Sequence, residues 1–335
     1  MTGFNEDELV AVVRKILSDQ SSEVRLGPGD DAALVRMGPH LGVLTTDMLV
    51  EGVHFVRDAI SARDLGYKAL TVNVSDVAAM GGSPRYGLVS LGLPPDIESA
   101  WVVELFGGLR DAAAEYAMSL VGGDMSRARE VVVSIAVTGE VAKNGAVTRA
   151  GARPGDCVVV TGRLGAAGGG LRLAQAPSHE VGVALASEWG RELLTAQVRP
   201  VARVGEGQTL AQAGATAMMD ISDGLAIDLS RLCRESGVAA TVRLVDVPVA
   251  PQLFELQRHL PVEPLDLALS GGDDYELLAA LPAEAVASAA KRVLERFGTP
   301  LTRIGDIREG EGLIAIEADG SERPLEPRGW DHFGG

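Results

Sequence analysis

Aspartates recur at the ends of apolar segments along the 335-residue sequence, mostly beside glycine or a hydroxyl residue. Carboxylate and hydroxyl oxygens are the ligands that Mg²⁺ and other hard cations prefer. Mg²⁺ typically takes one or two protein carboxylates and leaves its other positions to water and substrate phosphates. The pattern therefore predicts a site that holds nucleotide phosphates through several magnesium ions. The residues concerned are Asp30, Asp31, Thr45, Thr46, Asp47, Asp76, Asp124, Asp220, Ser222, Asp223, Asp273 and Asp274.

Asp76 carries the strongest signal, because it lies within the apolar segment ALTVNVSDVAAMG. A carboxylate on a buried helix is costly unless something compensates its charge. Asn73 shares a helical face with Asp76 at i, i+3, and few other polar residues extend that face. Two interpretations stay open from this segment: burial beside a cation, or an exposed helix face.

Turns and helix caps explain the other motifs when each is taken alone. The Gly-Pro-Gly before Asp30 and Asp31 is typical of a tight turn, and Asp223 suits a helix N-cap. The glycine-rich stretch at 162–170 lacks the Lys-Ser/Thr ending of a P-loop, and no EF-hand loop occurs. The recurrence of the motifs favours a functional site. Of the two aspartates that follow Gly-Pro-Gly, we expect Asp30 to bind metal.

The composition excludes several classes of function. Hydrophobic residues make up 46% and charged residues 23% of the chain, as in a globular protein. The net charge of −16 argues against nucleic acid and anionic membrane surfaces as partners. The first residues are acidic where a signal peptide is basic, and no apolar run is long enough to span a membrane. Because Cys157 and Cys233 form no CxxC motif, a cytoplasmic protein is expected.

Helical and strand patterns alternate along the chain and must position these motifs. Ser61 and Asp64 approximate a capping box at the start of a long helix. A loop rich in Gly, Arg and Pro at 145–156 marks a domain boundary, which divides the chain into domains 1–147 and 148–335. Helices are expected at 5–19, 61–82, 97–117 and 282–298, and strands at 42–55, 86–94, 130–141 and 157–162. A strand, a polar elbow and a helix are expected in succession over 215–237.

Six motifs resemble those of the thiamine-monophosphate kinases: GPGDDAA, TTDMLVEGVHF, NVSDVAAMGGSP, LVGGDMSR, DISDGL and SGGDDYELL, in this order. These enzymes belong to the ATP-binding superfamily of aminoimidazole ribonucleotide synthetase. The resemblance runs from about Gly27 to Trp330. It implies an α+β (mixed α/β) fold of two domains, of which the N-terminal one binds ATP and magnesium and pairs in a homodimer.

The resemblance also implies a reaction. The γ-phosphoryl group of ATP, the co-substrate, would be transferred to thiamine monophosphate, giving thiamine diphosphate in the last step of its biosynthesis. The acceptor phosphate has a second pKa of about 6, so it is mostly ionised at neutral pH and direct in-line transfer needs no general base. Clustered aspartates that hold several Mg²⁺ ions would position the two polyanions and neutralise their charge.

By the family pattern, the site residues fall into three groups. The metal ligands would be Asp30, Thr45, Thr46, Asp47, Asp76, Asp124, Asp220 and Asp223. Among them, those that act in catalysis would be Asp47, Asp76, Asp124 and Asp220. The residues that contact ATP would be Gly123, Asp124, Arg149 and Ser222. The residues that contact thiamine monophosphate would be His54, Asp274 and Trp330.

Two positions depart from the family pattern near the nucleotide. Met125 follows Gly-Gly-Asp where the family usually has threonine, which removes one hydroxyl. Phe106 stands where an aromatic residue, often tyrosine, lies near the adenine.

Other functions fit part of the pattern. Selenophosphate synthetases have a cysteine before the first aspartate motif and hydrogenase-maturation relatives end in a reactive cysteine, whereas this sequence has neither. The purine-pathway ligases share the nucleotide site but are not expected to contain LVEGVHF with its histidine. From another class, a non-catalytic acidic module that binds divalent ions would explain the charge, but not the Gly-Gly-Asp turns beside hydroxyl residues.

Overall fold

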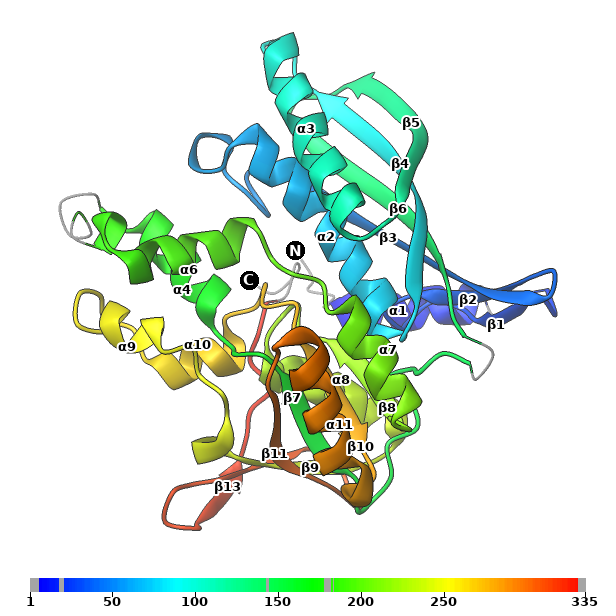
Figure 1. Cartoon of the computed structure of the whole chain (residues 1–335), viewed down its shortest axis with the longest axis vertical. Helices are drawn as coiled ribbons and strands as arrows, with labels where there is room; N and C mark the ends of the chain where they lie inside the picture. The colour runs from blue at the N-terminus through cyan, green and yellow to red at the C-terminus, as the bar shows by residue number, and fades with distance from the viewer. Residues whose placement is uncertain (1–5, 18–20, 143–144, 178–181, 183, 331–335) are drawn as a thin grey trace.

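The structure is a computed structural model that describes residues 6–17, 21–142, 145–177, 182 and 184–330. Two β-sheets, each with its own helices, form two domains (Figure 1). The strands of the first sheet are β1 (Val24–Leu26), β2 (Ala33–Met37), β3 (His40–Val50), β4 (Ser83–Leu93), β5 (Ser119–Arg127) and β6 (Val132–Glu140). The helices that precede or cover it are α1 (Glu6–Ile16), η1 (Arg57–Ala59), α2 (Ala62–Ala79) and α3 (Ser99–Glu115).

The strands of the first sheet lie in the order β1-β2-β3-β6-β4-β5, and all neighbours are antiparallel except β4 and β5. Helices α2 and α3 pack against each other on one face of this sheet (Figure 1). Glycines permit this approach: a Cβ at Gly66 of α2 would lie 2.0 Å from the carbonyl oxygen of Leu105 in α3. The opposite face of the sheet carries the exposed side chains of Met48, Tyr86 and Leu88.

Helix α2 begins as the sequence predicts. The hydroxyl of Ser61 accepts a hydrogen bond from the backbone N–H of Asp64 (3.0 Å), which caps the first turn. Almost all of the helix is buried, including Lys68 and Asn73. Polar side chains on a buried helix need partners, and those of α2 point toward the second domain and the strand β3.

The second sheet has the strand order β13-β12-β9-β11-β7-β10-β8. Its neighbours are antiparallel except β9 and β12. The strands are β7 (Cys157–Thr161), β8 (Ala217–Asp220), β9 (Ala239–Arg243), β10 (Leu277–Leu281), β11 (Leu301–Arg308), β12 (Leu313–Ile316) and β13 (Glu322–Pro324). The helices around it are α4 (Ala166–Gln175), α6 (Glu188–Val198), α7 (Val204–Gln212), α8 (Leu225–Ser236), η2 (Leu244–Asp246), α9 (Gln252–Leu256), α10 (Pro264–Ser270) and α11 (Ala283–Phe297).

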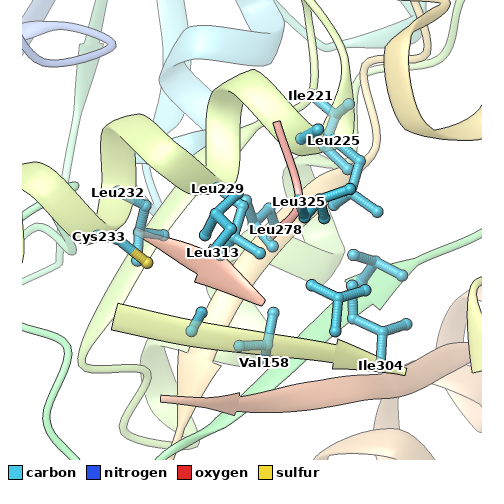
Figure 2. Close-up of a cluster of buried hydrophobic side chains, with 14 of the residues drawn as sticks. Val158, Ile221, Leu225, Leu229, Leu232, Cys233, Leu278, Ile304, Leu313 and Leu325 are labelled. Atoms are coloured by element: carbon cyan, nitrogen blue, oxygen red, sulfur yellow. The ribbon is translucent and has the colours of Figure 1, made fainter. Parts of the chain in front are cut away.

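Helix α8 packs against one face of the second sheet and builds its main core (Figure 2). Leu225 and Leu229 of the helix meet Val158 of β7 and Leu278 of β10. Since side chains alternate along a strand, Val159 of β7 faces the other way, into a second core with α7 and α11. The fold is therefore the predicted mixed α/β fold of two domains.

Helix α1 belongs to the first part of the chain but is held by the second domain. Arg14 forms an ion pair with Glu235 of α8 (3.0 Å), and Asp7 forms one with Arg234 (2.7 Å). The predicted boundary between residues 147 and 148 falls between the last strand of the first sheet and the first strand of the second. None of the helices in the described part of the chain is long and apolar enough to cross a membrane.

Candidate active site

A cleft of about 1450 Å³ lies between the two domains. The first domain contributes the loop before β2, strand β3 and one face of α2. The second contributes the elbow that follows β8, the loop 271–275 and part of α4, and helix α1 lies along the same cleft. Both halves of the chain are thus needed to form it.

Three carboxylates from separate elements meet in this cleft. Asp31 precedes β2, Asp76 lies near the end of α2, and Asp220 is the last residue of β8. One oxygen of each lies within 4.8 Å of the others. Asp76 is half-buried and lies beside other carboxylates, so the structure excludes the exposed helix face, one of the two interpretations left open for it.

Burial and mutual repulsion make these carboxylates hard to ionise without a cation. Burial first, and then the charges of Asp47, Asp220 and Asp31, raise the pKa of Asp76 well above its ordinary value. Burial and the charge of Asp31 do the same to the pKa of Asp220, although Ser75 donates a hydrogen bond to it. A cluster of this kind favours a bound cation, which removes the repulsion.

Arg149 supplies positive charge on one side of the cluster. Its Nε donates a hydrogen bond to Oδ1 of Asp31 (3.1 Å). The backbone N–H of Arg149 donates to the carboxylate of Asp30, the residue before Asp31 (3.1 Å). Burial, followed by the charge of Asp31, raises the pKa of Asp30 to about 6. The structure thus places Asp31 in the three-carboxylate cluster, while Asp30, the predicted ligand, lies beside it and also lines the cleft.

The donor set fits a hard cation such as Mg²⁺. Oδ2 of Asp31 is buried and has no hydrogen-bond partner among the described residues. An unpaired buried carboxylate oxygen is costly, and a cation would satisfy it. Thr45 adds a hydroxyl that donates to Asp76 and to the carbonyl oxygen of Asp31. Every group named is an oxygen ligand, as magnesium requires.

The second half of β3 is held against α2 by a side chain. The backbone N–H of Asp47 donates to Oδ1 of Asn73 (2.9 Å), and Asn73 in turn donates to the carbonyl oxygen of Ala69. Thr46 and Asp47 line the cleft next to Thr45, within the strand and not at its end. The predicted face of α2 that carries Asn73 and Asp76 therefore aligns the part of β3 on which three predicted ligands lie.

Other predicted residues also line the cleft. Nδ1 of His54 accepts a hydrogen bond from the N–H of Val50 (3.0 Å). The backbone N–H of Trp330 donates to the carbonyl oxygen of Asp223 (3.0 Å), which brings the end of the described chain to the elbow after β8. Ser222 lies on the same elbow. For His54 and Trp330 the sequence analysis relied on the resemblance alone, whereas Ser222 was also part of the aspartate pattern.

Three predicted residues lie outside the cleft lining. Gly123 and Asp124 are exposed on β5, the edge strand of the first sheet. Asp274 is directed to the start of α4, where its carboxylate accepts hydrogen bonds from the N–H groups of Gly165 (2.7 Å) and Ala167 (3.4 Å). Burial raises the pKa of Asp274 to about 8.

Two cleft residues were missed by sequence reasoning. Lys68 of α2 forms an ion pair with Asp273 (2.8 Å), and Tyr275 donates to the same carboxylate. Lys68 could have been found from its spacing, because Lys68, Val72 and Asp76 follow one helical face at i, i+4 and i+8. Tyr275 gave no such signal, since it follows a turn and precedes a buried strand.

Comparison with known proteins agrees with this geometry. The model of the AIR synthase related protein, N-terminal domain, matches residues 29–141, and that of the C-terminal domain matches residues 153–317. The thiamine-monophosphate kinase of Aquifex aeolicus is 37% identical over 307 residues, which are 91% of this chain and 92% of that protein. The thiamine-monophosphate kinase of Escherichia coli K12 is 38% identical and covers 93% of both chains. This chain belongs to the thiamine-monophosphate kinase family.

Solved structures support the same placement. A structure of AaThiL complexed with AMPPCP and TMP matches with a TM-score of 0.83 and 35% identity, over 98% of this chain and 97% of that one. E. coli HypE, a hydrogenase maturation protein, matches with a TM-score of 0.67 at 18% identity and shares the fold alone. The thiamine-monophosphate kinase family thus accounts for the whole two-domain architecture.

Proposed function

We propose that this chain transfers the γ-phosphoryl group of ATP directly to the phosphate of thiamine monophosphate, giving thiamine diphosphate and ADP. The carboxylates of Asp31, Asp76 and Asp220, grouped in a cleft between two domains, carry the proposal. Such a cleft is suited to two polyanions only if cations are held in it. Support comes from the relatives that bear this name and from the structural relative in complex with AMPPCP and TMP.

Mg²⁺ is the proposed cation. When bound, it neutralises charge on the phosphate oxygens and orients them for in-line transfer. Asp31, Asp76 and Asp220 would hold it, with the hydroxyl of Thr45 at the same place. The other proposed ligands in the cleft are Asp30, Thr46, Asp47 and Asp223.

The remaining cleft residues bind and orient the substrates in this proposal. Arg149 and Ser222, two of the residues proposed to contact ATP, line the cleft from the second domain. On either side of His54 in the sequence the cleft lining is apolar, with Val53 and Val56 exposed, which suits the rings of the acceptor. Because Nδ1 of His54 accepts a hydrogen bond, its neutral ring carries the proton on Nε2. No proton need be removed from an ionised phosphate.

A homodimer is proposed as the active assembly, formed in the cytoplasm. The open face of the first sheet carries Met48, Tyr86 and Leu88, which are 55%, 56% and 49% exposed. Exposed apolar side chains grouped on one sheet face are typical of a protein interface. Asp124 pairs with Ser90 of β4 in the same sheet. A second copy that covers this face would enclose Asp124, which suits its proposed role as a ligand better than exposure does.

Product formation tests the reaction. The protein is incubated with ATP, MgCl₂ and thiamine monophosphate, and thiamine diphosphate and ADP are quantified. Equal amounts of both products, formed only with the monophosphate and the metal, are expected. Parallel reactions omit Mg²⁺ or contain free thiamine. Formation of ADP without thiamine diphosphate would indicate that another compound is the acceptor. Absence of ADP would contradict the proposal.

A further inference from the structure

The carboxylate of Asp273 accepts hydrogen bonds from two side chains that belong to different domains. Oδ2 of Asp273 accepts a hydrogen bond from the ammonium of Lys68 (2.8 Å), which lies on α2. Oδ1 of Asp273 accepts one from the hydroxyl of Tyr275 (2.9 Å). The side chain of Lys68 is 4% exposed, so its charge needs a partner at all times. All three residues line the cleft.

The loop that carries Asp273 is held in an unusual conformation. Asp273 and Tyr275 have φ angles of +61° and +51°, in the left-handed region that non-glycine residues rarely adopt. The backbone N–H groups of these two residues donate to the carbonyl oxygens of Ser222 (2.6 Å) and Ile221 (2.8 Å), next to Asp220. Strain that the surroundings maintain is common at ligand sites. The loop thus presents Asp273 and Tyr275 beside the carboxylate cluster.

We propose that Lys68 and Tyr275 bind the phosphate of the acceptor, and that Asp273 occupies their donors when the acceptor is absent. This inference rests on the proposed function and names the groups that select a phosphorylated acceptor. A phosphate presents neighbouring oxygens as a carboxylate does, and it carries more charge. Two donors that already meet on one anion are therefore arranged to bind another.

Two other cations of the cleft are engaged more firmly. Arg149 binds Asp31, and Arg231 binds both Asp223 and Asp228, each through its guanidinium. Lys68 uses one of the three donors of its ammonium on Asp273, whose side chain is 35% exposed and can take up water when it is displaced. Lys68 is thus a cation that a phosphate can recruit with little rearrangement.

This arrangement explains how an acceptor without a phosphate would be refused. An uncharged hydroxyl cannot replace the carboxylate of Asp273 as partner of a buried ammonium. A phosphate dianion can, because its bonds to an ammonium are charge-assisted. Free thiamine would therefore leave Asp273 bound to Lys68 and Tyr275, whereas the phosphate of thiamine monophosphate would displace Asp273 from them.

Three variants and a matched control test the inference. Lys68→Met and Tyr275→Phe each remove a donor, Asp273→Asn removes the competing charge, and Lys291→Met removes a lysine that is 74% exposed on α11. KM for thiamine monophosphate and for ATP, and kcat, are measured for each. Calorimetric titration with inorganic phosphate, thiamine monophosphate and free thiamine supplies the affinities, and thermal unfolding shows that each variant is folded.

Loss of a hydrogen bond to a charged group corresponds to a loss of affinity of about tenfold to a hundredfold. Lys68→Met should therefore raise KM for thiamine monophosphate by at least about tenfold and leave KM for ATP and the affinity for free thiamine unchanged. Tyr275→Phe should show the same selective loss, and Lys291→Met none. Asp273→Asn should bind inorganic phosphate more tightly than the unaltered protein.

Two outcomes would overturn the inference. One is that Lys68→Met weakens ATP and thiamine monophosphate equally, which is the result of a purely structural role. The other is that Asp273→Asn weakens phosphate binding, because the carboxylate would then be part of the subsite. Absence of turnover by the unaltered protein would contradict the proposed function instead, and a selective loss of phosphate affinity in Lys68→Met would still support this subsite.

Discussion

The guanidinium of Arg149 binds Oδ1 of Asp31, while Oδ2 of the same carboxylate is buried with no hydrogen-bond partner in the described part of the chain. One oxygen is neutralised by the protein and the other is left to a ligand. Asp76 and Asp220 lie within reach of that ligand. The arginine therefore offsets part of the cost of a charged Asp31 in the cleft before any cation binds, although burial still raises the pKa of this carboxyl.

Replacing Arg149 with glutamine should destabilise the protein, because Asp31 would then lie buried without its cation. The free energy of unfolding should fall by about 3 kcal/mol, as when one partner of a buried ion pair is removed. Urea denaturation at neutral pH with EDTA measures it. Arg234→Gln is the control, since Arg234 is 53% exposed and pairs with Asp7; its loss should stay below about 1 kcal/mol. Equal losses would contradict this account.

Asp76→Asn should lower kcat by at least about a hundredfold, the usual effect of removing a group that stabilises charge in the transition state. The fold should remain, and in EDTA the variant should be at least as stable as the unaltered protein, because one of several like charges is gone. Steady-state kinetics and urea denaturation test both points. Asp319→Asn, on an exposed turn, is the matched control. Full activity of Asp76→Asn would exclude Asp76 from the site.

The metal-free protein should lose stability as the pH rises. The pKa values of Asp76 and Asp220 are raised in the folded state, so the folded protein binds protons that the unfolded chain has released. Stability then falls with increasing pH above about 4, where unfolded aspartate ionises. Added Mg²⁺ should raise the melting temperature more at pH 8 than at about pH 5, because it binds the ionised carboxylates. A magnesium effect independent of pH would contradict this.

Asp274 should contribute its own pH dependence. Its pKa is about 8 in the folded protein and about 4 in an unfolded chain, so it reduces stability progressively between these values as the pH rises. Asp274→Asn keeps the size of the side chain and removes the charge. Its free energy of unfolding should decline less steeply than that of the unaltered protein over this range. Parallel slopes in urea denaturation at several pH values would show that Asp274 does not titrate there.

Leu88→Glu should convert the proposed dimer to monomers, because a charge in an apolar interface is left without a partner. Sedimentation velocity measures the oligomeric state. Val103→Glu is the control: Val103 is 66% exposed on α3, which packs on the other face of the sheet. The prediction is wrong if Leu88→Glu sediments as the unaltered protein does.

Local patterns predicted the elements well. Ser61 caps α2 because its hydroxyl accepts a hydrogen bond from the backbone N–H of Asp64, as expected for a serine followed three residues later by an acidic residue. Asp76 was singled out because a carboxylate within an apolar helix must be compensated. The sequence also predicted Thr45, Thr46 and Asp47 as ligands; they do line the cleft, although β3 continues past them to Val50.

The features of the site that the sequence did not predict depend on contacts between distant segments. Asp30 and Asp31 are neighbours in one turn, and both bind Arg149, which follows Asp31 by 118 residues. Lys68 and Asp273 are separated by 205 residues. Asp274 is directed to the start of α4 because the left-handed backbone on either side of it turns its neighbours toward the cleft. Such choices depend on how two domains dock, which no local pattern records.

The carboxylate cluster also ties the two domains together. Asp31 and Asp76 belong to the first domain and Asp220 to the second, so a cation shared by all three is a cross-link between them. Part of the binding free energy of the ion would then stabilise the docking of the two domains. Chelation should therefore weaken this docking, which the ion pairs between the domains, such as that of Lys68 with Asp273, would still maintain.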